Sequence, residues 1–372
     1  MNPRVSIARC SNYQPGFVYD AVKKSVDLLG GVSCFIKPLS SVLVKPNVLM
    51  AEPPEIGVTT HPEVLRAVIR LLKEIGCKIF VGDSPSVWGK YIDNVEQVYK
   101  TTGVTDVCTQ EGVELVKFDK KVWNKKIPYT SWLDKCDHLV NVPKFKTHGL
   151  TLLTAGVKNL FGLVPGTYKT ELHKNFFQID RFSEMLIDIY QRASPSLTII
   201  DGVIAMEGDG PSSSGVLRNA GIIVSSSDCV AIDTVLATIM GIDPLCVPTI
   251  KEARKRKLSG TDLDSIDVLG DAISSVKGRA FKLPRTSRMV AFPEIIANIA
   301  KKLIRYYPYS DHSRCIKCAA CIKACPNKII YFRSNLIAFD YSKCIACFCC
   351  QEVCPQAAIK IKRSMLAKMI GL

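Results

Sequence analysis

Eight cysteines near the C-terminal end of the chain fall into two runs with the same spacing. Each run reads Cys-x-x-Cys-x-x-Cys-x-x-x-Cys-Pro, at Cys315, Cys318, Cys321 and Cys325 and again at Cys344, Cys347, Cys350 and Cys354. Three thiolates spaced in this way wrap a short loop around one face of a metal cluster, and the fourth reaches across to a second cluster. No other feature of the sequence restricts the fold as strongly.

This spacing is typical of bacterial ferredoxins with two [4Fe-4S] clusters. We therefore predict cluster I on Cys315, Cys318, Cys321 and Cys354, and cluster II on Cys344, Cys347, Cys350 and Cys325. Zinc sites and disulfide frameworks are weaker interpretations, because neither requires this doubled register. Cys349 is left over between two predicted ligands, and we expect a thiol beside the cluster rather than a ninth ligand.

The chain is much longer than these runs require. Its 372 residues, 47% of them hydrophobic, are enough for one large domain and one small domain. The N-terminal sequence MNPRVSIARC lacks the apolar core of a secretion signal, and the apolar run at 289–300 contains a glutamate and is too short to span a bilayer. We therefore expect a cytoplasmic protein, in which cysteines stay reduced and available to bind iron.

Positive charge is concentrated at the cysteine-rich end. Residues 271–372 hold 18 of the 49 Lys and Arg but only 5 of the 34 Asp and Glu, which gives them +13 of the net charge of +15. Part of this excess offsets the negative charge of the clusters. The remainder suits an acidic redox partner protein, or peripheral contact of the basic C-terminal segment with an anionic membrane. Nucleic acid is the weaker interpretation, because no recognition motif is present.

The first 270 residues alternate between apolar runs and helical patterns. Strands are predicted at 5–8, 41–44, 78–81, 114–118, 138–142, 197–200 and 221–224, and helices at 18–29, 62–75, 151–160, 180–191, 228–240 and 247–256. This order favours an α/β fold, with a mostly parallel sheet covered by helices on both faces. Thr60, followed by Pro62 and Glu63, predicts a capping box at the start of the second helix.

Four regions follow from these patterns. We predict an α/β ligand-binding domain at 1–270, a basic linker and helix at 271–310, a small α+β ferredoxin-like domain with two [4Fe-4S] clusters at 311–360, and a basic tail at 361–372. The helix of the second region is an amphipathic pattern at 293–306.

Polar residues recur where the predicted strands end, which is the edge where open α/β sheets bind ligands. We predict substrate-binding roles for Lys45, Asn47, Asp83, Lys144, Lys158, Asn159, Gly208 and Gly210, and catalytic roles for His148, His61 and Lys146. Together with His173, these side chains would form a cationic cleft for a phosphate- or carboxylate-bearing small molecule. Each lysine alone is as readily a surface charge, so the prediction depends on their recurrence. His61, Asp228 and Asp233 also suit helix starts.

No nucleotide-binding or catalytic motif accompanies these residues. The loop GDGPSSSG lacks the Lys-Ser/Thr ending of a P-loop and the GxGxxG fingerprint, so we interpret it as a turn or a ligand-lining loop. The nucleophile motif Gly-x-Ser-x-Gly is absent from the sequence.

Seven segments in fixed order resemble a known family, the domain of unknown function numbered 362, over roughly residues 41–270. They are VLVKPN, GVTTHPEV, VGDSP, NVPKFKTHG, GVKNLFGLVPG, DGVIAMEGDGP and DCVAID. The resemblance implies an iron-sulfur protein with an α/β domain, and it brings no assigned activity.

Three functions are compatible with the sequence. The one we favour is an oxidoreductase that passes low-potential electrons through the clusters to an anionic substrate, with His148 or His61 supplying protons. The alternatives are an electron-transfer carrier or adaptor, and a non-redox α/β enzyme whose clusters serve structure or regulation. The sequence does not assign a further cofactor, such as a flavin, between the clusters and the substrate.

Overall fold

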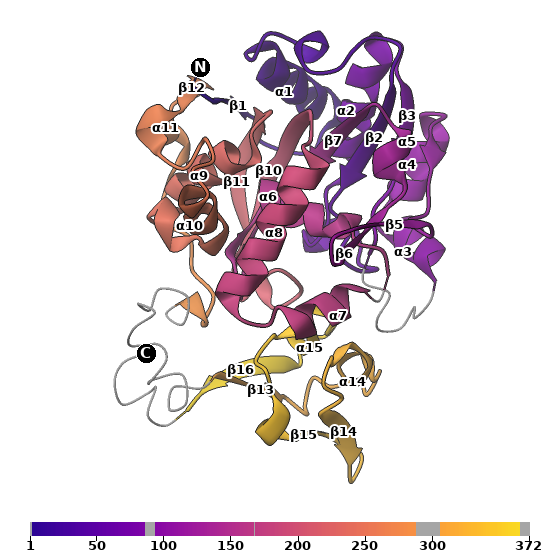
Figure 1. Cartoon of the computed structure of the whole chain (residues 1–372), viewed down its shortest axis with the longest axis vertical. Coiled ribbons are helices and arrows are strands. Elements are labelled where there is room, and N and C mark those ends of the chain that lie inside the picture. The colour runs from indigo at the N-terminus through magenta and orange to yellow at the C-terminus, as the bar shows by residue number, and fades with distance from the viewer. Residues whose placement is uncertain (1, 86–93, 167, 288–305, 365–372) are drawn as a thin grey trace.

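The computed structural model describes residues 2–85, 94–166, 168–287 and 306–364. Most of the amphipathic helix predicted at 293–306, and residues 365–372 of the predicted tail, lie outside these ranges. Figure 1 shows a large α/β domain with the small cysteine-rich domain, in yellow, at one end of it.

A ten-stranded sheet forms the centre of the large domain. Its main path runs β12-β1-β11-β10-β7-β2-β3-β4. Along this path β11 runs antiparallel to β1 and β10, and the other neighbours pair in parallel, which confirms the predicted fold class. The strands are β1 (Arg4–Arg9), β2 (Ser41–Pro46), β3 (Lys78–Val81), β4 (Glu114–Leu115), β7 (His138–Val142), β10 (Leu197–Gly208), β11 (Gly215–Ser226) and β12 (Asp267–Gly270).

Helices cover both faces of the sheet because alternate strand residues are apolar on both sides. Val42 and Val44 of β2 pack into one hydrophobic core, and Leu43 between them packs into another. The first core includes residues of α1 (Pro15–Asp27), α2 (Pro62–Glu74), α3 (Val95–Thr101) and α4 (Val104–Gln110). The second includes residues of α6 (Gly156–Asn159), α7 (Tyr168–Asn175), α8 (Ile179–Ala193), α9 (Cys229–Met240) and α10 (Pro248–Lys255). The remaining elements of this domain are β5 (Lys121–Asn124), β6 (Ile127–Thr130), α5 (Trp132–Lys135) and α11 (Ile273–Val276).

The helix predicted at 151–160 is wrong in its first half. Lys144–His148 forms β8, Leu152–Thr154 forms β9, and the helix α6 begins only at Gly156. β8 pairs with β10 on one side and with β9 on the other, so the segment KFKTH continues the sheet instead of ending it. The hairpin of β8 and β9, which the long-range pairing of β8 with β10 holds in the sheet, overrides the local helical pattern.

The predicted capping box at Thr60 is also wrong. His61 is the N-cap of α2, and its ring nitrogen Nδ1 accepts a hydrogen bond from the Glu63 N–H at 3.2 Å. The Thr60 hydroxyl instead donates to the Val142 carbonyl at 2.6 Å and accepts from the Asn47 N–H at 2.8 Å. Thr60 therefore ties the end of β2 to the end of β7.

Of the two aspartates suited to helix starts, Asp228 caps the helix that follows it. Its carboxylate accepts from the N–H groups of Val230 and Ala231 at 2.8 and 3.0 Å. Asp233 serves a different helix, because it accepts from the N–H groups of Gly156 and Val157 at the start of α6.

The small domain is built from two strand pairs and two short helices. β13 (Tyr306–Ser310) pairs with β16 (Ile359–Arg363), and β14 (Ile330–Arg333) forms a hairpin with β15 (Leu336–Phe339). The helices α14 (Ala320–Ala324) and α15 (Cys349–Glu352) each carry part of one cysteine run. In Figure 1, α15 lies at the boundary with the large domain, beside α7.

Residues 271–287 are packed against the large domain and do not form the free tether expected of a linker. Phe281 and Thr286 are buried, and the Arg279 guanidinium donates to the Glu207 carboxylate at 2.7 Å. Glu207, which is 1% exposed, also contacts Arg218 at 3.2 Å and accepts from the Lys282 N–H. The hairpin of β10 and β11 therefore holds this segment in place.

Replacing Glu207 with Gln is expected to lower the free energy of unfolding by about 1.5–3 kcal/mol, because charged hydrogen bonds to a buried carboxylate are lost. Asp209→Asn, which removes a more exposed pair with Arg285, should cost less than about 1 kcal/mol. Urea denaturation and the rate of trypsin cleavage within 277–287 measure the difference. Equal effects of the two variants would contradict the role of Glu207 in holding residues 277–287 against the large domain.

Candidate functional site

A cavity with about 100 Å³ of open space lies where the carboxyl edge of the large domain's sheet meets the small domain. The large domain lines it with predicted site residues Asn47, Asp83, Lys146, His148, Lys158 and Asn159, and also with Thr154, Lys169 and His173. The small domain contributes Ala324, Cys349, Glu352 and Val353. The site is thus shared between the sheet edge and the helices that carry the cysteine runs.

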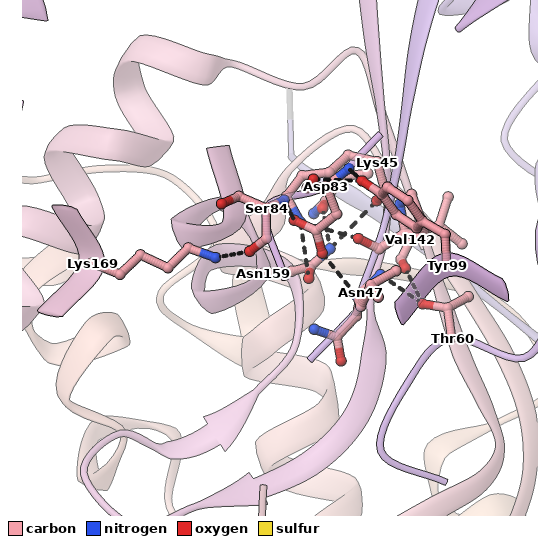
Figure 2. Close-up of polar contacts among 12 residues, drawn as sticks. Lys45, Asn47, Thr60, Asp83, Ser84, Tyr99, Val142, Asn159 and Lys169 are labelled. Atoms are coloured by element: carbon pink, nitrogen blue, oxygen red, sulfur yellow. Dashed lines mark hydrogen bonds and ion pairs between the residues drawn. The ribbon is translucent and has the colours of Figure 1, made fainter. Parts of the chain in front are cut away.

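A buried ion pair supports the floor of this cavity. Lys45 Nζ lies 2.9 Å from Asp83 Oδ1, and the two side chains are 0% and 3% exposed. The Asp83 carboxylate also accepts from the N–H groups of Val48 and Ser84 at 2.7 and 2.8 Å. Lys45 further donates to Asn159 Oδ1 at 3.3 Å (Figure 2). Lys45 therefore lies beneath the cavity lining with its charge already balanced.

The chain approaches this ion pair very closely at Gly162, in the turn after α6. A Cβ atom there would lie 2.1 Å from Asp83 Oδ1 and 2.5 Å from Lys45 Nζ. Such distances are far below van der Waals contact, so glycine is required for the turn to close over the pair. The close approach therefore accounts for the glycine that ends the segment VKNLFG.

Lys146 extends from β8 into the wall of the cavity. Its ammonium donates to Asn47 Oδ1 and to the Val58 carbonyl, both at 2.7 Å. Burial, assisted by the positive charges of Lys144 and Lys158, lowers the pKa of Lys146 to about 7. An ammonium donates three hydrogen bonds, so one N–H remains for a ligand.

Two further lysines line the cavity from α6 and α7. Lys158 has no hydrogen-bond or ion-pair partner among the described residues, and its ammonium lies 4.7 Å from the centre of the Phe161 ring. Lys169 donates to the Ser84 carbonyl (Figure 2), and burial lowers its pKa to about 8. Burial also lowers the pKa of Lys158. An anion in the cavity would stabilise the charged form of all three lysines.

His148, at the end of β8, directs one ring nitrogen towards the cavity and the small domain. Its Nδ1 accepts from the N–H groups of Leu150 and Thr151 at 3.0 and 3.3 Å. Nδ1 therefore carries no proton, and the neutral ring bears its N–H at Nε2. Nε2 lies 3.3 Å from Glu352 Oε1 but makes no hydrogen bond within the described part of the chain.

Burial and nearby lysines lower the pKa of His148 well below its usual value, and burial lowers that of His173 to about 3. Both rings are therefore neutral at physiological pH. A second buried polar atom in the lining, the Thr154 hydroxyl, also lacks a hydrogen-bond partner among the residues described. Buried polar groups are normally satisfied, so these atoms indicate a cavity shaped for a polar occupant.

The remaining predicted residues lie elsewhere. Lys144 pairs with Asp201 at 2.9 Å, and both side chains are almost fully buried. The Lys144 ammonium also donates to the Tyr13 hydroxyl at 2.6 Å, and the Tyr13 ring stacks on His61 at 3.6 Å. This second polar cluster is internally satisfied and does not line the cavity.

Gly208 is the last residue of β10, and Gly210 lies in the loop between β10 and β11. A Cβ atom on Gly210 would lie 2.5 Å from the Thr147 carbonyl oxygen, so this glycine lets the loop pack against β8. The next residue, Pro211, lines the cavity. The structure thus gives the GDGP segment a packing role beside the site.

The eight predicted cluster ligands surround two further cavities. Cys315, Cys318, Cys321 and Cys354 line one, and Cys325, Cys344, Cys347 and Cys350 line the other. Within the described ranges, no three Cys, His, Asp or Glu side chains converge tightly enough for a single metal ion. Four thiols around an otherwise apolar cavity fit the ligand chemistry of an iron-sulfur cluster.

Sequence reasoning did not find the small domain's share of the site. Cys349 and Glu352 stand in a cysteine run whose spacing already had an explanation, and only the packing of α15 against the large domain places them in the lining. Lys169 follows no predicted strand. The pattern that could have indicated Cys349 and Glu352 is their difference from the matching residues of the first run, Ala320 and Lys323.

The chain belongs to the family described as Domain of unknown function (DUF362), whose model matches residues 42–238. A second family model, described as a 4Fe-4S dicluster domain, matches residues 307–355. The small domain is therefore a 4Fe-4S cluster-binding domain, and it supports iron-sulfur electron transfer.

A curated relative is the thylakoid-associated protein sll1697 of Synechocystis sp. (strain ATCC 27184 / PCC 6803 / Kazusa). It is 34% identical over 265 residues, which cover 69% of this chain and 80% of the relative. A similar solved structure is the lactate racemase apoprotein from Thermoanaerobacterium thermosaccharolyticum, with a TM-score of 0.37, 13% identity, and coverage of 64% of this chain and 57% of the other. At that score the likeness supports no functional statement.

No helix in the described ranges has both the length and the apolar character needed to cross a membrane.

Gly162→Ala is expected to destabilise the protein by about 3 kcal/mol or more, because the new methyl group would force apart the buried Lys45–Asp83 pair. Gly16→Ala, where a Cβ meets nothing within 4 Å, is the matched control and should stay within about 1 kcal/mol. Chemical denaturation measures both. A Gly162→Ala protein as stable as the control would show that the backbone at Gly162 does not lie against the Lys45–Asp83 pair.

Proposed function

We propose that the protein is an oxidoreductase that uses low-potential electrons from two [4Fe-4S] clusters to reduce a small anionic molecule bound in the cavity. The observation that carries the proposal is the composition of the cavity wall. Lysines of the large domain and the cysteine-bearing helix α15 face the same enclosed space. Electron source and anion site would then be adjacent.

Cluster I would be held by Cys315, Cys318, Cys321 and Cys354, and cluster II by Cys344, Cys347, Cys350 and Cys325. Each set surrounds its own cavity, which is the arrangement expected when the fourth ligand comes from the other run. The clusters would supply one-electron transfer at low potential.

The size and charge of the cavity narrow the substrate class. A buried water needs about 10–15 Å³, so a cavity of about 100 Å³ holds at most about ten water-sized groups. That suits a small molecule bearing a carboxylate or a phosphate. Lys158, the third N–H of Lys146 and the His148 Nε2–H are donors without a partner among the described residues.

Proton supply would come from Lys146, with His148 as an orienting hydrogen-bond donor. A group that gives protons near neutral pH is most effective when its pKa lies near 7, as burial arranges for Lys146. The neutral His148 ring presents its Nε2–H to the cavity and can hold a substrate oxygen. His61 lies in the Tyr13 cluster and has no part in this proposal.

Acetate, whose own charge is constant from about pH 6 to 9, should bind more weakly as the pH rises. Lys146 and Lys169 lose their protons near pH 7 and 8, and each deprotonation removes a positive charge that the anion needs. Affinity is expected to fall by up to tenfold per pH unit above these values. Isothermal titration calorimetry across this range tests it. A flat or rising affinity would exclude these lysines from the binding site.

Lys158→Met should slow substrate reduction at low substrate concentration, because the unpartnered ammonium is the charge most available to the anion. Protein with its clusters reconstituted under anaerobic conditions is reduced, mixed with short-chain carboxylates and phosphate esters, and followed by the recovery of cluster absorbance. Lys158→Met should keep the cluster spectrum but lose about ten- to hundredfold in affinity, the worth of one charged hydrogen bond. Lys251→Met, at an exposed position of α10, is the control.

If another protein reoxidises the reduced clusters and none of these anions does, the protein is an electron carrier and the proposal is wrong.

A further inference from the structure

The two cysteine runs share their ligand spacing but differ at the positions between the ligands. Where the first run has Lys317, Ala319, Ala320 and Lys323, the second has Ala346, Phe348, Cys349 and Glu352. Equal spacing imposes the same local fold on both, so these differences reflect what each run faces.

The second run faces the large domain. Phe348 is 2% exposed and packs with Leu150 in a small hydrophobic core, against which Ala346 also packs. Cys349 and Glu352 line the substrate cavity. These four differences therefore lie at the boundary between the domains.

Much of the first run faces solvent, although its residue Ala324 is buried and lines the substrate cavity. Ile316 is 57% exposed, and Arg314, Lys317 and Lys323 are exposed too. Ile316 and Lys317 also form part of the wall of the cavity surrounded by Cys315 and its partners, so a protein touching them would approach that cavity directly. None of these three cations makes an ion pair with a described residue.

Carboxylates are scarce on this domain. Residues 306–364 contain three, and each is already engaged: Asp311 pairs with Lys360 at 2.8 Å, Asp340 accepts from Ser342, and Glu352 faces His148. The exposed surface of the first run is therefore cationic around one apolar side chain. Such a surface is complementary to an acidic patch on another protein.

We propose that the first run is the docking face for an acidic one-electron carrier protein, through Arg314, Ile316, Lys317 and Lys323. Electrons would then reach the cavity from the side of the second run. One electron leaves the carrier and one is accepted behind this face, with no atom transferred. The proposal rests on the two-cluster assignment of the proposed function, and it adds a direction to the electron path.

The test is binding of a small acidic plant-type [2Fe-2S] ferredoxin, used as the probe, to the cluster-loaded full chain in the absence of any small anion. Lys317→Glu combined with Lys323→Glu should weaken the Kd at least tenfold and flatten its dependence on salt. Lys24→Glu combined with Lys251→Glu makes the same change in net charge on the large domain and should alter the Kd less than threefold.

Iron and sulfide content and the absorbance spectrum establish that each variant carries its clusters, and Lys317→Gln with Lys323→Gln repeats the test with a milder change. Unchanged binding, or equal weakening by both charge-reversal pairs, would overturn the docking face. Because no substrate is present, failure here is distinguishable from failure of anion reduction.

Discussion

The buried pair of Lys45 and Asp83 is the interaction on which the site depends. Two charges removed from water carry a desolvation penalty of several kcal/mol each, which their attraction offsets only if the remaining donors and acceptors are satisfied. Here they are, because Asp83 accepts from two backbone N–H groups and Lys45 reaches both Asn159 and a carbonyl. The pair joins the ends of β2 and β3 to the turn at Gly162, and so fixes the sheet edge from which the cavity is built.

The cavity wall above the Lys45–Asp83 pair differs from it in the completeness of its hydrogen bonding. Its lysines are only partly satisfied, and the His148 Nε2 and Thr154 hydroxyl make no hydrogen bond among the described residues. This difference in hydrogen bonding distinguishes residues that hold the fold from residues that could bind a ligand. Groups with complete hydrogen bonding, such as Lys144 with Asp201, hold the fold, whereas groups left incomplete in a low-dielectric space are the ones that a polar ligand would complete.

Much of the fold could be predicted from the sequence, since alternating apolar runs and helical patterns depend on local periodicity. The errors occurred where tertiary contacts decide. Leu152–Thr154 forms a strand instead of a helix because it pairs with β8, which β10 holds in the sheet, and the Thr60 hydroxyl bonds to the Val142 carbonyl instead of capping the helix. Strand-end position predicted one group containing Lys45, Lys144 and Lys158, but it could not tell which charges were already paired, as those of Lys45 and Lys144 are. The contribution of Cys349 and Glu352 depends on how the two domains pack, which the ligand spacing of the cysteine runs does not encode.

The central claim is that an anion in the cavity and the iron-sulfur clusters lie close enough to affect each other. The midpoint potential of the cluster-loaded protein, measured with and without saturating acetate, tests it most directly. Added negative charge beside a cluster disfavours reduction, so the account predicts a lower potential with acetate and, by linkage, weaker acetate binding to the reduced protein. The Lys158→Met variant should lose the shift. A potential unchanged by bound acetate would contradict the account.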